Sequence, residues 1–170
     1  MKEDQIKRRL MTVTALAAEY CATLENAAQM EKDEFVDRML DLLPRIYWEF
    51  FDISADDIVL LEESDFYASY IDEDYYESVR RQIEAVIGPD DVFLETFEED
   101  MKYSDTPIAA SIAESLADIF QPLYNFISVV KDTDGDKLVE AYMQAKEDFV
   151  SYWSQTLCNV LRALNHLKYK

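Results

Sequence analysis

The sequence has few residues that break helices and few that bind metals. Its 170 residues include two glycines, four prolines, two cysteines and one histidine. Antiparallel β-proteins need a turn at every strand reversal, and glycine and proline supply most of these turns. The scarcity of both residues therefore argues against a β-sandwich or barrel and favours an all-α protein.

The same shortages exclude several kinds of functional site. Nucleotide-binding loops need several glycines, and zinc or di-iron sites need clustered histidines or cysteines. The single histidine, His166, is expected on the surface near the end of the chain. Cys21 and Cys158 lie in segments with helical apolar spacing, so we expect both to be buried and reduced. We expect no metal ion and no cofactor.

Long apolar runs are missing as well. No stretch approaches the roughly 18 apolar residues that span a membrane, and no apolar segment follows the first residues as in a signal peptide. We expect a single helical-bundle domain over residues 1–170, located in the cytoplasm and without membrane contact. The sequence leaves the oligomeric state open.

Apolar residues recur at three- and four-residue steps along most of the chain, which is the spacing of one face of an α-helix. The predicted fold is all-α: a kinked up-and-down bundle of four long helices with a short extra helix in an acidic crossover. Pro44 and Pro122 should kink two of the long helices, because proline has no N–H to donate. The predicted helices cover about residues 4–29, 33–51, 74–87, 106–130 and 137–167.

Two motifs indicate where helices begin. Asp74 and Glu77 have the spacing of a capping pair, which predicts the start of the short helix. Thr106 followed by Pro107 predicts the start of the next long helix. The patterns do not assign residues 54–70, before the short helix, or residues 90–104, after it.

Two other motifs indicate turns. Gly88 and Pro89 predict the end of the short helix. Residues 133–136 predict a turn between the last two helices, with Gly135 in the left-handed conformation and an aspartate capping the following helix. The segment 137–167 should then be one continuous helix.

The negative charge is concentrated in one part of the chain. The formal net charge is −20, and residues 52–105 contain 18 acidic and three basic residues, a net charge of −15. Such a segment repels phosphates, so we expect no nucleic-acid binding. The charge keeps the protein soluble, forms a docking surface for a basic protein partner or binds divalent cations, and an acidic mimic of nucleic acid is a further alternative.

The acidic segment is also rich in tyrosine. Tyr67, Tyr70, Tyr75 and Tyr76 are candidate binding residues. Tyrosines among carboxylates can cover the edge of a core with their hydroxyls in water, or they can anchor a protein interface. The sequence does not separate these two roles.

Three motifs, together with Trp153, carry a resemblance to a known family: LLPRIY at 42–47, SLADIF at 115–120 and VLRAL at 160–164. In this order, they resemble the bacterial family catalogued as domain of unknown function 5063. The resemblance implies a small helical protein with no assigned activity. It also implies that polar or histidine residues often stand at the positions of Thr156, Asn159 and Asn165.

The same motifs suggest a second group of candidate binding residues: Arg45, Asp118, Trp153 and Arg162. They are polar or amphipathic residues beside apolar stripes on three predicted helices. They form either a structural ion pair next to a packed tryptophan, or a small pocket whose arginine binds an anionic ligand.

No complete set of catalytic residues is present, and we name none. The leading hypothesis is a non-enzymatic protein-interaction module that uses an acidic, tyrosine-rich surface. The alternative is an enzyme that depends on a metal or an anionic ligand, with a carboxylate and arginine pocket inside the bundle.

Overall fold

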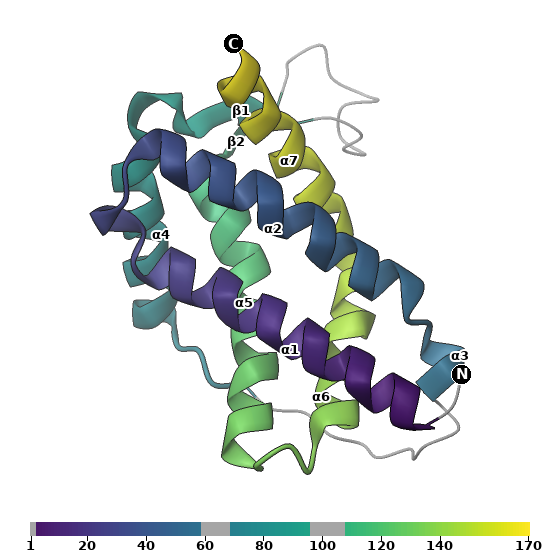
Figure 1. Ribbon diagram of the computed structural model, residues 1–170. Helices are drawn as coiled ribbons and strands as arrows, with labels where there is room; N and C mark the ends of the chain where they lie inside the picture. The colour runs from purple at the N-terminus through teal and green to yellow at the C-terminus, as the bar shows by residue number, and fades with distance from the viewer. Residues whose placement is uncertain (1–2, 59–68, 96–107) are drawn as a thin grey trace.

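The computed structural model describes residues 3–58, 69–95 and 108–170 (Figure 1). Most of these residues are helical, which confirms the predicted all-α class. Tyr67 and the predicted helix start at residues 106–107 lie outside the described ranges.

The first two long helices form one layer of the bundle. Helix α1 (Glu3–Glu25) and helix α2 (Lys32–Asp52) are joined by the short 3₁₀ turn η1 (Ala27–Gln29) and run antiparallel. Figure 1 shows them crossing in front of the other long helices at an oblique angle. Helix α2 continues through Pro44, and the one-turn helix α3 (Ala55–Ile58) follows it.

The second layer contains the remaining helices. Helix α5 packs against α1, α4 and α6, so it lies at the centre of the molecule. The short helix predicted in the acidic crossover is α4, and it covers one side of α5 (Figure 1). The bounds are α4 (Glu73–Ile87), α5 (Ile112–Asp132), α6 (Leu138–Asp148) and α7 (Ser154–Tyr169).

A small antiparallel sheet precedes α5 and corrects the predicted start of that helix. The 3₁₀ turn η2 (Gly88–Asp91) leads into β1 (Val92–Leu94), which pairs with β2 (Ala109–Ser111). Because residues 109–111 pair with β1, α5 begins at Ile112 and not near Thr106.

Side chains from the strand region cap α5. The Ser111 hydroxyl accepts a hydrogen bond from the Glu114 N–H at 3.1 Å. The Asp91 carboxylate accepts from the Ser111 hydroxyl at 2.6 Å and from the Ala113 N–H at 2.7 Å. These acceptors satisfy donors in the first turn of the helix, as N-caps do.

Two predicted caps are also corrected. Asp72, and not Asp74, caps α4 by accepting from the Tyr75 N–H at 2.7 Å. At the start of α6, the Thr133 hydroxyl accepts from the Lys137 N–H at 3.2 Å, where an aspartate was expected.

Both predicted turn glycines are confirmed. Gly88 ends α4 with φ of 69° and Gly135 lies in the turn before α6 with φ of 83°. A side chain is strained in this left-handed region, which explains the use of glycine at both positions.

The predicted last helix is interrupted. A π-helical turn, η4 (Phe149–Trp153), separates α6 from α7. The buried residues Ala145, Phe149, Trp153 and Leu157 follow one another at three steps of four residues. In an α-helix each such step rotates by about 40°, so the wider π turn keeps these side chains on one face.

An aromatic cluster lies where η4 meets α2. The Phe50 ring lies 4.9 Å from the Trp153 ring and 5.1 Å from the Tyr142 ring, and Phe149 lies 4.7 Å from Trp153. Trp153 is fully buried, and its Nε1–H donates to the Ala145 carbonyl at 3.1 Å. The cluster therefore joins the two layers, and the buried indole N–H of Trp153 has a hydrogen-bond acceptor.

The two cysteines differ from expectation in one respect. Cys21 is buried as predicted, but Cys158 is exposed on α7. Within the described residues, no helix is long and apolar enough to cross a membrane.

We expect Trp153→Ala to lower the free energy of unfolding by about 3–5 kcal/mol, because it removes a large buried ring. Trp48→Ala is the matched control, since the Trp48 side chain is exposed. It should change stability by less than about 0.5 kcal/mol. Urea denaturation followed by circular dichroism measures both values, and equal losses would contradict the packing described above.

Candidate functional site

Two tyrosines of α4 donate hydrogen bonds to carboxylates of neighbouring helices. The Tyr75 hydroxyl bonds to Glu25 at the end of α1, and the Tyr76 hydroxyl bonds to Asp118 of α5 at 2.5 Å. The pKa of both tyrosines is raised, mainly by burial and secondly by these hydrogen bonds. They therefore remain protonated donors and attach α4 to the bundle.

Tyr70 has a similar role just before α4. Its hydroxyl donates to Asp132 at 2.9 Å, and its N–H donates to the Asn125 side chain at 2.7 Å. The three described tyrosines among the predicted binding residues thus all bond to acceptors of α1 or α5.

Asp118 is a half-buried carboxylate at the centre of an acidic group. Burial raises its pKa above the usual 3.8, the hydrogen bond from Tyr76 acts in the opposite direction, and nearby Glu114 raises it further. Glu77 also lies close enough to influence the Tyr76 hydroxyl, but it is paired with Arg80 of the same helix at 3.0 Å. We call Glu114 and Asp118 the acidic rim.

A proline connects the acidic rim to the π-helical turn. Pro122 has no N–H, so the Asp118 carbonyl lacks its usual partner within α5. The Tyr152 hydroxyl of η4 donates to this carbonyl at a long 3.5 Å. Pro122 thus leaves an acceptor in α5 that a side chain of η4 reaches.

Beside Tyr152 lies a groove of about 330 Å³ on the outer side of η4 and α7, which we call the α7 groove. Its lining is mostly polar, with hydroxyl and amide side chains and the carboxylate of Glu95, which follows β1. Glu95 accepts a hydrogen bond from the Asn159 amide at 2.6 Å. The groove is lined by Glu95, Val150, Ser151, Tyr152, Ser154, Gln155, Thr156 and Asn159.

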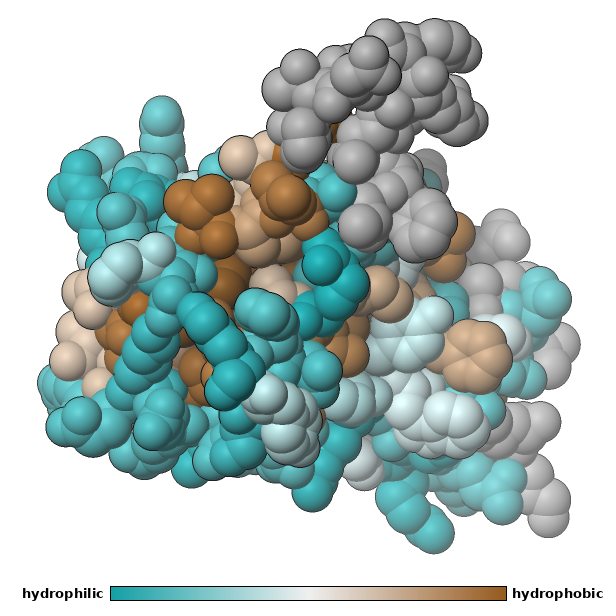
Figure 2. Space-filling view, turned by 90° about the horizontal axis from the view of Figure 1, so that it is seen from above, coloured by the Kyte–Doolittle hydropathy of each residue, from teal (hydrophilic) through white to brown (hydrophobic). Residues whose placement is uncertain are grey.

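The strand β1, which leads into Glu95, adds exposed apolar side chains. Val92 is 68% exposed and Leu94 is 55% exposed. Figure 2 looks onto this end of the bundle and shows hydrophobic side chains gathered next to the grey residues. The Arg162 guanidinium donates to the Leu94 carbonyl and so ties α7 to β1.

The structure gives the four residues Arg45, Asp118, Trp153 and Arg162 separate contacts. Arg45 is exposed on α2 and pairs with Asp41 one turn away at 3.1 Å. Asp118 bonds to Tyr76, Trp153 is in the aromatic core and Arg162 bonds to β1. Asp118 lies close to the α7 groove because its carbonyl accepts a hydrogen bond from Tyr152, which lines the groove. Arg162 lies close to it because it bonds to Leu94, the residue before Glu95.

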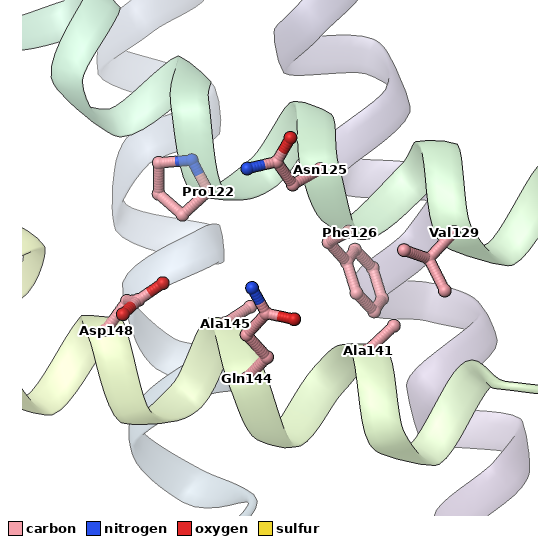
Figure 3. Close-up of a pocket in the computed structure, with 8 residues that line it drawn as sticks. All are labelled: Pro122, Asn125, Phe126, Val129, Ala141, Gln144, Ala145 and Asp148. Atoms are coloured by element: carbon pink, nitrogen blue, oxygen red, sulfur yellow. The ribbon is translucent and has the colours of Figure 1, made fainter. Parts of the chain in front are cut away.

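A second hollow lies between α5 and α6 (Figure 3). Pro122, Asn125, Phe126 and Val129 face Ala141, Gln144, Ala145 and Asp148 across it. Its free volume is about 10 Å³, which is room for about one water molecule. Burial raises the pKa of Asp148 at its edge. This hollow is too small for an organic ligand.

Metal binding has no support in the described ranges. No three histidine, cysteine, aspartate or glutamate side chains among the described residues are placed to hold a metal ion. One partly buried carboxylate, Glu49 of α2, is paired with a cationic side chain instead, because Arg9 of α1 lies 2.9 Å from it.

The sequence did not indicate most of the groove. Thr156 and Asn159 were marked by the family resemblance, and both line it. Asn165 is exposed further along α7. Glu95, Val150 and Tyr152 were missed. The four-residue spacing of the apolar residues from Ala145 to Leu157 was a signal for the π turn, which presents Val150 and Tyr152.

We expect Asp118→Asn to increase stability at about pH 7, because the folded state has a raised carboxyl pKa and thus disfavours the charged form. The asparagine oxygen can still accept from Tyr76. The gain should disappear below about pH 3.5, where the wild-type carboxyl is protonated in both states. Urea denaturation of both proteins at the two pH values measures this, with Asp136→Asn in the exposed turn before α6 as the control. A loss of stability at neutral pH would contradict it.

Comparison with known proteins supports the fold and the family. The crystal structure of protein BF1032 from Bacteroides fragilis matches with a TM-score of 0.78 and 27% identity, covering 95% of this chain and 93% of that one. No curated protein matches the chain. The family model described as "Domain of unknown function (DUF5063)" matches residues 4–170. The chain therefore belongs to the DUF5063 family.

Proposed function

We propose that this protein is a cytoplasmic, non-enzymatic interaction module that binds a basic segment of a protein partner in the α7 groove and along the acidic rim. The observation that carries the proposal is the position of a polar, open groove beside a group of carboxylates. The hollow between α5 and α6, in contrast, has room for about one water molecule.

The lining of the α7 groove suits a peptide. The hydroxyls of Ser151 and Thr156 donate to helix carbonyls at 3.3 and 3.4 Å, and their oxygens can still accept hydrogen bonds from a peptide backbone. Val150, which is 69% exposed, offers an apolar contact at one end. Together these features combine polar recognition with a hydrophobic contact.

The charge of the surroundings favours a basic segment. Glu95 lines the groove, and Asp118 and Glu114 extend the negative surface along α5. Arg162 is nearby, but it is bonded to the Leu94 carbonyl. A cationic side chain would gain from these carboxylates, and the overall charge of −20 would attract it from a distance.

The test is binding of a fluorescein-labelled, lysine-rich peptide, measured by fluorescence anisotropy. The double variant Glu95→Gln/Glu114→Lys should bind about tenfold more weakly at about 50 mM salt, since each exposed charge contributes about 0.5 kcal/mol. Raising the salt to about 500 mM should weaken wild-type binding as well.

The control is Glu34→Gln/Asp136→Lys, which changes the net charge by the same amount at exposed positions of α2 and of the turn before α6. It should keep most of the affinity. Equal weakening in both double variants would show attraction by net charge alone and would contradict a site at the groove.

A further inference from the structure

A pair of exposed aromatic side chains lies far from the α7 groove in the sequence, near the end of α2. Trp48 is 55% exposed and Phe51 is 59% exposed, and their rings are 6.0 Å apart. Large aromatic side chains are seldom exposed together unless they contact something else.

The core supports this pair from below. Phe51 stacks on Tyr47 at 6.3 Å, and Tyr47 packs edge-on against the buried Phe149 at 5.4 Å. The exposed rings are therefore held on a rigid helix, and a partner that binds them loses little side-chain entropy in the protein.

The surroundings of the pair are acidic. Residues 41–57 contain five carboxylates and one arginine, Arg45. Arg9 of α1 pairs with two of the five, Glu49 and Asp52, and Arg45 pairs with Asp41. Asp56 is exposed on α3. The carbonyl end of α2 adds further negative potential.

An exposed tryptophan beside carboxylates favours a cation. The indole ring attracts a guanidinium or ammonium group over its face, and Asp52 lies one helical turn further along the same helix. A second copy of this chain would bring the same charge of −20 against itself, so charge disfavours self-association.

We propose that Trp48 and Phe51 form a second docking surface, which we call the aromatic patch, for an arginine-bearing apolar segment of the basic partner. The cation lies over the Trp48 ring near Asp52, and an apolar side chain packs on Phe51. This inference rests on the proposed function for the charge of the partner, but it assigns a surface separate from the α7 groove.

The chain has two tryptophans, and their difference gives a direct readout. Trp153 is fully buried, so acrylamide quenches mainly Trp48. The probe is a synthetic peptide of alternating arginine and leucine at low salt, compared with one in which asparagine replaces arginine. We expect the arginine peptide to protect Trp48 from acrylamide at least about threefold better than the asparagine peptide.

Affinity for the arginine peptide is then measured with variants by fluorescence anisotropy. Trp48→Ala and Phe51→Ala should each weaken binding about tenfold or more, as for central aromatic contacts. Met11→Ala, which removes a similarly exposed apolar side chain from α1, is the matched control and should leave the affinity unchanged.

The outcomes separate the two proposals. If the peptide binds, Trp48→Ala keeps full affinity and Glu95→Gln/Glu114→Lys loses it, the aromatic patch is wrong and the groove stands. If the peptide does not bind the wild type at any salt concentration, both proposals are wrong. If sedimentation shows a dimer that Trp48→Ala dissociates, a second copy covers the patch and this inference is overturned.

Discussion

The shortage of cationic side chains is the constraint on which the rest of this structure depends. With 36 acidic and 16 basic residues, the bundle cannot hold its acidic crossover in place with ion pairs alone. It uses tyrosine hydroxyls as neutral donors to carboxylates: Tyr70 to Asp132, Tyr75 to Glu25 and Tyr76 to Asp118. The tyrosine-rich composition thus has a structural explanation, because a neutral donor satisfies a carboxylate where lysine and arginine are scarce.

The helices were predictable because their signal is local. Apolar periodicity located α1, α2 and α4, and the glycines at positions 88 and 135 marked turns that require positive φ. The start of α5 was not predictable in this way. It depends on the pairing of residues 109–111 with β1, a contact between segments that the local pattern left unassigned.

The candidate site depends even more on tertiary structure. The sequence indicated Asp118, Trp153 and Arg162, but not that they would have three different partners. The α7 groove combines Glu95 with residues more than fifty positions later, and hydrogen bonds from Asn159 and Arg162 to the end of β1 bring them together. The exposed pair at Trp48 and Phe51 had no signal either, because apolar residues in a helix usually predict burial.

The π-helical turn gives its segment one residue more than a continuous α-helix would need, because its hydrogen bonds span five residues instead of four. One residue fewer between Phe149 and Trp153 would join α6 to α7 in a continuous helix, and nearly the same face of α7 would point to the core. Leu157 and Val160 would then stay buried, while the outward side chains of the turn, such as Val150 and Tyr152, would change position. Homologous chains can therefore differ by one residue at this turn and keep the bundle, and such a difference would reshape the surface beside α7.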